Sequence, residues 1–323
     1  MNIEKAMTRL IKQGTQDSNH KKNFLLRKLK KDAKDPKWED AMRRTLDNEW
    51  MLRLCMANLI NREYDWEGWG LREPRDLLIP DLAPWWCGEK VESLLILGEQ
   101  GLGDEILFAS MFEDVRKWAD NITVECDSRL VNIFSRNFPD IEFIGRKHYN
   151  PGFWGTDDSW ADGREWTAQT LMGDLPTWFR KDKLEFPNSG AYLMSDVDSR
   201  YLGKTGYSWV GRQGHVDLNP SPDGLSLQYG VDDHLGLAVP DIDLKDDIDG
   251  LFAVIAGLEK VVSVPTTVVH IAGALGVHVE LVLPQRGMNH GGFDDNKVNN
   301  SLNWRFHDTG CDWHPSVKIR GSK

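Results

Sequence analysis

The sequence predicts an α/β protein made of two Rossmann-like halves that face a cleft, preceded by a short helical extension. Three observations predict this class. Ser93–Leu97 (SLLIL) is a continuous apolar run that leads into a glycine turn, as expected of a parallel strand buried on both faces. Strand-like and helix-like segments then alternate, and a similar alternation returns from about residue 207. Residues 1–60 carry a helical pattern instead.

Length and composition agree with this architecture. The chain has 323 residues, of which 40% are hydrophobic, so it can form two domains with a sizeable core, and disordered, collagen-like and coiled-coil classes are excluded. We expect a helical extension over residues 1–60, a first Rossmann-like domain over 61–195 and a second over 196–323.

The charge is unevenly distributed. Lys and Arg number 39 against 50 Asp and Glu, a net charge of −11. Residues 1–48 hold 13 basic and 7 acidic residues, or +6, which leaves −17 for residues 49–323. A basic arm of this kind can contact nucleic acid, but the apolar residues interleaved with its lysines favour a solvated helix face. The acidic body argues against a general nucleic-acid binder.

The sequence predicts a cytoplasmic protein, in the host cytoplasm if a phage encodes it. No apolar stretch approaches the roughly 18–20 residues of a membrane span, and the first residues (MNIEKAMTRLIKQ) carry charges where a signal peptide is apolar. The four cysteines form no C-x-x-C pair, which argues against a zinc cluster or a disulfide framework. They are Cys55, Cys87, Cys126 and Cys311.

The helical extension is predicted from one apolar stripe at a spacing of four residues, and a Trp-, Gly- and Pro-rich connector follows it up to Gly88. The stripe consists of Trp38, Met42, Leu46, Trp50 and Leu54.

The elements of the two halves are predicted from apolar runs and capping residues. After Ser93–Leu97 we expect a helix from Glu105 to Ala119, a strand at Ile122–Cys126, a helix capped by Asp127 or Ser128, and a strand at Ile141–Ile144. Residues 145–205 are predicted to be loop and short helix, including Thr167–Phe179. The second half is predicted as Tyr207–Val210, Leu235–Val239, helix Asp249–Ala256, strand Lys260–Val264, helix Thr267–Leu275 and strand Val277–Leu283.

The clearest local motif is the glycine turn Gly98–Asp104 (GEQGLGD) between a strand and a helix. Glycines let backbone N–H groups approach a ligand, and a helix N-terminus favours an anion such as a phosphate. As a dinucleotide fingerprint the turn is incomplete, because Ile106 replaces the third glycine, although Glu125 lies where a ribose-binding acid is expected. Binding of a nicotinamide cofactor is therefore a minor alternative.

Asp104 has two equally weighted interpretations. A carboxylate at a helix start is stabilised as an anion, and at the carboxyl end of a strand it can act as a general base toward a hydroxyl. The same residue can simply cap the helix.

A second motif runs from Ser263 to Gly276. Thr266 and Thr267 come at the start of a predicted helix, where hydroxyls and free N–H groups together suit a diphosphate, and His270 lies one turn further on. The alternative is a threonine N-cap and a packed histidine. Several D-x-D strings occur, at residues 196–198, 241–243 and 247–249, but 50 acidic residues produce such strings by chance, so a metal site is not predicted.

Taken in order, these motifs resemble the glycosyltransferase domain that follows tetratricopeptide repeats in many bacterial and phage proteins. That domain is similar to the heptosyltransferases of glycosyltransferase family 9 and more distantly to O-linked N-acetylglucosamine transferases. The resemblance spans about residues 60–315. It rests on WEGW at 66–69, WCG at 86–88, GEQGLGD at 98–104, VEC at 124–126, GDLP at 173–176, YSW at 207–209 and 264–276.

The resemblance implies a GT-B fold in which the first domain binds the acceptor and the second the nucleotide sugar. It implies transfer of a hexose or heptose to a hydroxyl with inversion, without a metal and with no cofactor beyond the nucleotide-sugar co-substrate. The acceptor is left open between glycan, lipid, protein and modified nucleic acid.

The resemblance also implies roles for individual residues. Asp104 matches the catalytic base and lies in the glycine loop with Gln100, Gly101 and Gly103. The donor-binding positions are Thr266, Thr267 and His270, the strand-end pair Ser208 and Trp209, and, on charge alone, Arg212.

Two departures from the family pattern matter. Pro265 stands where the family has an aspartate that contacts the donor sugar, which argues against heptose as the donor, and Asp174 replaces a serine. Residues 1–60 match at most the last helices of a repeat array. The alternatives to a transferase are a catalytically inactive GT-B-like protein that binds a nucleotide sugar, motivated by Pro265, and an NAD(P)-dependent enzyme.

Overall fold

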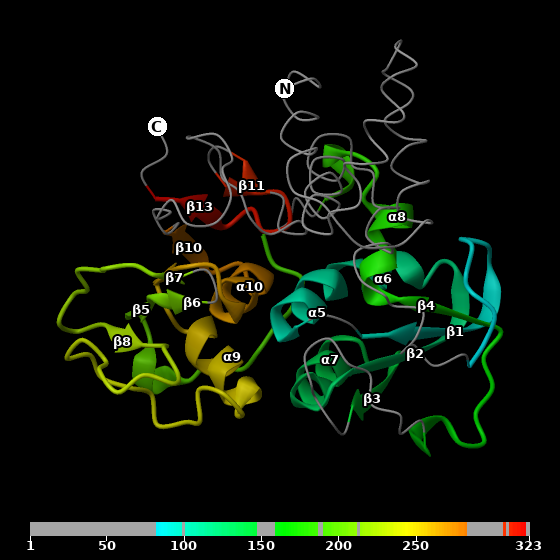
Figure 1. Ribbon diagram of the computed structural model, residues 1–323, viewed down its shortest axis with the longest axis horizontal. Helices are drawn as coiled ribbons and strands as arrows, with labels where there is room; N and C mark the ends of the chain where they lie inside the picture. Colours follow the sequence, from blue (N-terminus) through cyan, green and yellow to red (C-terminus); the bar gives the residue numbers. More distant parts are fainter. Residues whose placement is uncertain are drawn as a thin grey trace, which may run out of the picture.

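The computed structural model describes residues 82–98, 101–146, 159–186, 190–211, 214–282, 306–307 and 310–320. The predicted helical extension at residues 1–60 and its apolar stripe lie outside these residues. Figure 1 shows two separate sheets, with helices between them.

The first sheet has four parallel strands in the order β3-β2-β1-β4. Residues 94–97 of β1 are completely buried, as their unbroken apolar run predicts. The predicted strands are confirmed, although β2 begins earlier than expected. The bounds are β1 Val91–Leu97, β2 Ala119–Asp127, β3 Glu142–Arg146 and β4 Ala168–Leu171.

The helix predicted over Glu105–Ala119 is shorter and starts earlier. Helix α5 begins at Leu102 because Gly101 adopts an extended backbone and caps it. A 3₁₀ turn follows, and α6 ends at Val115, since Ala119 already pairs with Val91 as the first residue of β2. Asp127 caps the next helical segment as predicted. The bounds are α5 Leu102–Phe108, α6 Phe112–Val115 and α7 Val131–Asn137.

The prediction of loop and short helix for Thr167–Phe179 was wrong at its start. Ala168–Leu171 forms β4, which pairs with the buried end of β1, and only Pro176–Phe179 forms a helix, α8. The strand was not predicted because Gln169, a polar residue, interrupts the apolar pattern, although its side chain is completely buried. Its carboxamide oxygen accepts hydrogen bonds from the Leu82 and Ala83 N–H groups at 2.9 and 3.1 Å.

The second sheet has the order β11-β12-β13-β10-β9-β5-β8, with a parallel centre and antiparallel pairing at the β11 end. The helices and strands predicted from residue 249 onward are confirmed. The strands are β5 Thr205–Ser208, β8 Leu225–Ser226, β9 Lys260–Ser263, β10 His278–Leu281, β11 Phe306–His307, β12 Gly310–Cys311 and β13 Val317–Ile319, with a separate hairpin of β6 Val210–Gly211 and β7 Gly214–His215; the helices are α9 Ile248–Ala256 and α10 Thr267–Ala274.

Residues 235–239, predicted to continue the second α/β unit, form no strand. Leu235 and Gly236 both have positive φ, 57° and 71°, which turns the chain, and only Ala238 makes an isolated bridge, to Leu225. The strand that pairs with the outer edge of β5 is β8 instead.

The two sheets meet through helices. Where the sequence predicts a cleft, α5 contacts α10 directly, and one apolar cluster contains residues from both sheets, including Ile96 and Val261 (Figure 1). Polar contacts also cross the junction. Arg136 forms a bidentate ion pair with Asp249, and Arg129 Nη1 donates to the Lys245 carbonyl at 2.9 Å. The domain boundaries at residues 60 and 195 stay predictions. Among the described helices, none has the length and apolar character that a bilayer crossing needs.

Candidate active site

The glycine turn joins the carboxyl end of β1 to the N-terminus of α5. Gly98 follows the strand, and its N–H donates to the Glu125 backbone carbonyl at 2.7 Å. Gly101 is the N-cap, with φ −120° and ψ 167°. Gln100 lies outside the described residues, so its predicted place in the glycine loop stays a prediction.

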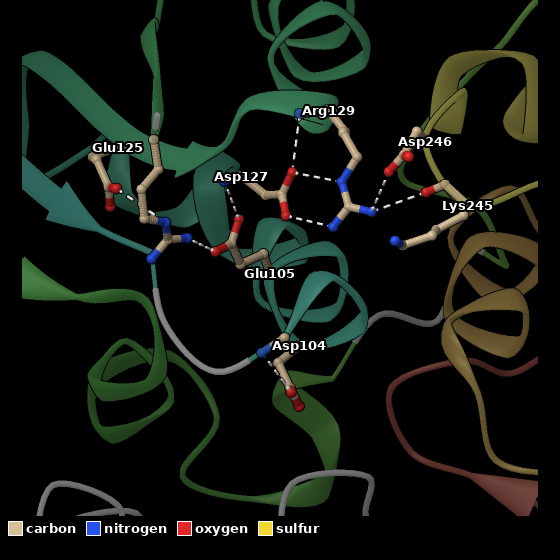
Figure 2. A network of polar contacts seen from close by, with 9 residues as sticks. Asp104, Glu105, Glu125, Asp127, Arg129, Lys245 and Asp246 are labelled. Carbon is tan, nitrogen blue, oxygen red and sulfur yellow. Dashed lines mark hydrogen bonds and ion pairs between the residues drawn. The ribbon is translucent and has the colours of Figure 1, made fainter. Parts of the chain in front are cut away.

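Asp104 is the third residue of α5, and its side chain helps to cap the N-terminus of this helix. Its Oδ2 accepts a hydrogen bond from the Gly101 N–H at 3.2 Å. The side chain is partly exposed and points away from the neighbouring Glu105 (Figure 2). The geometry therefore shows the capping interaction, and a carboxylate with a solvent-accessible side keeps the general-base role available. That role stays a prediction.

Gly103 lies at the contact between the two predicted motifs. A Cβ on this residue would lie 2.6 Å from the His270 Cδ2, so the α5 backbone rests directly on the imidazole of α10. Packing across the junction therefore requires a glycine here. The contact places the first turn of α5 beside the first turn of α10, although the two segments are far apart in sequence.

His270 faces a second histidine at this junction. Its Nδ1 lies 3.1 Å from Nε2 of His314, which stacks on the Tyr192 ring, and the Tyr192 hydroxyl donates to the Ile106 carbonyl in α5 at 2.9 Å. Both imidazoles are completely or almost completely buried. Burial lowers the pKa of His314 to about 3, and burial together with the neighbouring His314 holds the pKa of His270 well below its usual value.

Lowering the pH below about 6.5 is expected to destabilise the fold through this histidine pair. Each imidazole stays neutral when folded but binds a proton near pH 6.5 when unfolded, so the unfolded state gains protons first and stability falls as the pH falls from 6.5 toward the folded pKa. For His314, the loss between pH 7.5 and 5.5 is about 1 kcal/mol. Urea unfolding of the wild type and of His314→Asn at both pH values measures it.

Comparing the two proteins isolates the histidine. Burial raises the pKa of Glu105, so the contribution of Glu105 to the free energy of unfolding falls as the pH rises. This contribution is the same in both proteins and cancels in the comparison. The variant should lose about 1 kcal/mol less than the wild type between the two pH values. Substitution of the exposed His278 by Asn is the control. An identical pH dependence in wild type and His314→Asn would contradict the buried neutral pair.

The second motif forms the carboxyl end of β9 and the start of α10. Thr266 is the N-cap of α10 with an extended backbone, and its Oγ1 lies 3.2 Å from the Ser263 Oγ. Thr266 and Thr267 are partly exposed. Gly211 packs on this start, since a Cβ there would lie 3.0 Å from the Pro265 carbonyl oxygen and 3.2 Å from the Thr266 methyl. Two partly exposed threonines thus lie at a helix N-terminus, the kind of position at which anions bind.

Ser208 and Trp209 lie at the end of β5, beside β9, but both are buried. The Ser208 hydroxyl and the Trp209 N–H donate to the Gln228 carboxamide oxygen, each at 3.0 Å, and the indole packs in an apolar cluster with Tyr207 and Val262. These contacts fix the position of the carboxyl end of β5. Arg212 lies outside the described residues, so its predicted phosphate contact is untested.

A buried charge cluster beneath the glycine turn was missed by sequence reasoning. The Arg146 guanidinium pairs with the carboxylate of Glu105 and lies 3.2 Å from the Glu125 carboxylate. Burial raises the pKa of Glu105 to about 8 and that of Glu125 to about 7, against the lowering effect of Arg146. Two carboxyls share one guanidinium, so one proton on the pair neutralises the cluster. Glu125, which the nicotinamide alternative needs as a ribose ligand, is used inside this cluster.

Asp127 extends the polar contacts toward the second sheet. Its carboxylate accepts two hydrogen bonds from the Arg129 guanidinium, at 2.9 and 2.7 Å, and Arg129 reaches Lys245 and Asp246 on the other side (Figure 2). One signal was available in the sequence. Glu125 and Asp127 are charged residues two apart at the end of an apolar strand, and they therefore lie on the same side of β2.

Comparisons with known proteins give limited similarity. No protein-family model matches the chain. Protein FlbA of Caulobacter vibrioides is 25% identical over 243 residues, which cover 60% of this chain and 40% of FlbA, so the chain spans about two fifths of that relative. Among solved structures, the glycosyltransferase TibC of enterotoxigenic E. coli gives a TM-score of 0.42 at 10% identity, covering 60% of this chain and 58% of TibC. A family 9 glycosyl transferase from Veillonella parvula gives 0.40 at 13%, covering 60% and 81%.

Proposed function

We propose that this protein is a glycosyltransferase that moves a sugar from a nucleotide-sugar donor to a hydroxyl of an acceptor, with inversion and without a metal. The observation that carries the proposal is the contact of Gly103 with His270. It packs the first turn of α5, which carries Asp104, against the first turn of α10, which carries Thr267. A base and an anion site next to each other are what transfer to a hydroxyl needs.

In the proposed reaction, Asp104 takes the proton of the acceptor hydroxyl. The acceptor oxygen forms a bond to the anomeric carbon as the bond from that carbon to the diphosphate oxygen breaks on the opposite face. The diphosphate leaves with the electron pair, and its charge is stabilised by the N-terminal N–H groups of α10, by Thr266 and Thr267, and by Arg212. Thr266 and Thr267 support this assignment by their accessible position at the helix start.

His270, Ser208 and Trp209 receive an indirect role in this proposal. Their side chains are buried and engaged with His314, Gln228 and an apolar cluster respectively. We assign them to holding the ends of β5 and α10 in place. The acceptor remains a glycan, lipid, protein or modified nucleic acid.

A donor of the right class is expected to stabilise the protein against heat. A ligand at about 100 times its dissociation constant adds about 2.7 kcal/mol to the free energy of unfolding. Thermal unfolding with UDP-, GDP-, ADP- and CMP-sugars, including ADP-heptose, and with NAD(P), tests this. We expect one nucleotide-sugar class to raise the melting temperature, and Thr267→Val, which removes a hydroxyl but keeps the shape, to reduce that rise. Stabilisation by NAD(P) alone would contradict the proposal.

The second candidate is a nucleotide-sugar-binding protein without transferase activity. Pro265 favours it, because a proline at the residue before Thr266 offers no carboxylate to the donor sugar. This candidate predicts donor stabilisation with no release of nucleoside diphosphate in the presence of any acceptor.

A further inference from the structure

We propose that Arg146 is the positioning residue of the glycine turn, because one guanidinium ties the end of β1 to the first turn of α5. The inference rests on the proposed function, since it gives Arg146 a role through Asp104. Arg146 itself is the last residue of β3, on the far side of β2 from the turn.

The contacts of Arg146 reach both ends of the turn. Its Nη1 donates to the Gly98 carbonyl at 3.1 Å, where the chain leaves β1. Its Nη2 donates to the Glu105 carboxylate, in the first turn of α5. The guanidinium thus bridges Gly98 and Glu105, although Arg146 itself lies in β3, which is not one of the two elements that the turn connects.

The carboxylates of Glu125 and Glu105 connect Arg146 to the sheet. Glu125 pairs with the Arg146 Nε at 3.2 Å and accepts from the Gly98 N–H at 3.1 Å, while Glu105 accepts from the Asp127 N–H at 2.7 Å. Each carboxylate therefore joins the turn or its helix to β2 as well as to Arg146. The side chains of Arg146, Glu105 and Glu125 are at most 12% exposed, so water competes little with these contacts.

Gly98, at the start of the turn, is tightly packed. A Cβ on Gly98 would lie 2.8 Å from the Glu105 Oε1 and 3.0 Å from the Arg146 Nη2. The same Cβ would lie 2.7 Å from the Glu125 backbone carbonyl, so the Gly98 backbone rests both on β2 and on the charged groups. A displacement of the guanidinium therefore moves Glu105, the neighbour of Asp104 in α5, and a shift of about 1 Å in a reacting group can lower a rate by about 100-fold.

Arginine is required here for its shape. A planar guanidinium presents donors in several fixed directions, whereas a lysine ammonium on a flexible stem cannot reproduce the contacts to Gly98, Glu105 and Glu125 together. Arg146→Lys keeps the charge that the two buried carboxylates need but removes the bridge. It therefore separates positioning from charge balance.

Hydrogen exchange and kinetics on the full chain test the proposal. In Arg146→Lys we expect backbone amides of residues 98–106 to exchange at least about 5-fold faster than in the wild type. We expect kcat for sugar transfer to fall at least about 10-fold with the donor KM within about 3-fold, because the base is displaced and the donor site on α10 is not. Arg164→Lys is the matched control, since Arg164 pairs with Glu142, at the other end of β3, in the open.

Unchanged exchange at residues 98–106 in Arg146→Lys would overturn the proposal, as would faster exchange with an unchanged kcat. If the wild type transfers no sugar, the proposed function fails, and the exchange comparison in the free protein decides on Arg146 by itself. If Arg146→Lys does not fold, Glu105→Gln replaces it, because glutamine keeps an acceptor for the Asp127 N–H and loses the ion pair. Faster exchange at 98–106 in that variant supports the proposal and unchanged exchange overturns it.

Discussion

Asp104→Asn is expected to lower the rate of sugar transfer by about 10²–10⁴-fold while leaving the fold and donor binding nearly intact. Asparagine has no basic carboxylate, but its amide oxygen can still accept the hydrogen bond that the Gly101 N–H donates to Asp104 at 3.2 Å. The substitution therefore removes the base and keeps the cap. Release of nucleoside diphosphate measures the rate, and the donor-induced rise in melting temperature measures binding.

Asp104→Ala supplies the comparison that separates the two interpretations of this residue. It removes the capping acceptor as well, which costs about 0.5–2 kcal/mol of stability. Asp120→Asn, at an exposed residue paired with Lys90, is the control for a change of charge alone. Transfer at the wild-type rate in Asp104→Asn would rule out the base. Loss of stability and donor binding in Asp104→Ala, with transfer intact in Asp104→Asn, would leave Asp104 as a structural cap.

Trp313→Ala is expected to lower the free energy of unfolding by about 3–5 kcal/mol. The indole is 1% exposed and lies edge-on to Phe186, with ring centroids 4.7 Å apart, and to Phe108 of α5 at 6.0 Å. The Arg180 guanidinium lies 5.8 Å from the ring centroid. Removal of this side chain leaves a cavity where the segment after β12 packs on α5, and urea unfolding measures the loss.

Two controls make the Trp313 result specific. Trp313→Phe keeps part of the aromatic packing and is expected to lose less than the alanine variant. Trp118→Ala, at a tryptophan that is 40% exposed, is expected to cost about 1 kcal/mol or less. A loss below about 1 kcal/mol for Trp313→Ala would mean that residues 310–320 do not pack on α5 in solution.

Packing, more than the charged contacts, is expected to stabilise the junction. The Arg136–Asp249 pair is partly exposed on both sides, and such pairs contribute about 0–1 kcal/mol. Trp313 and His270, in contrast, are each only 1% exposed, and His270 packs directly on Gly103. The relative placement of Asp104 and Thr266 therefore depends on the fit of α5 against α10.

Local sequence pattern determined the elements on which the site is built. The unbroken apolar run at 94–97 identified β1, and the Thr266 cap identified the start of α10, because burial on both faces and capping are properties of a few neighbouring residues. The same reasoning proposed Asp104 as either cap or base. The structure shows the cap contact, and the base stays a prediction.

The tertiary structure alone decided which distant residues meet. Gln169 reads as a loop residue until the backbone of residues 82 and 83 is placed against it, and Arg146 carries no signal until β3 pairs with β2. For His270 the sequence left a ligand contact and a packed histidine open, and its buried neighbour His314 is seen only in the tertiary structure. The physical reason is common to all three: the burial and the partners of a polar side chain are set by segments many residues away, and periodicity or spacing within one segment contains no information about them.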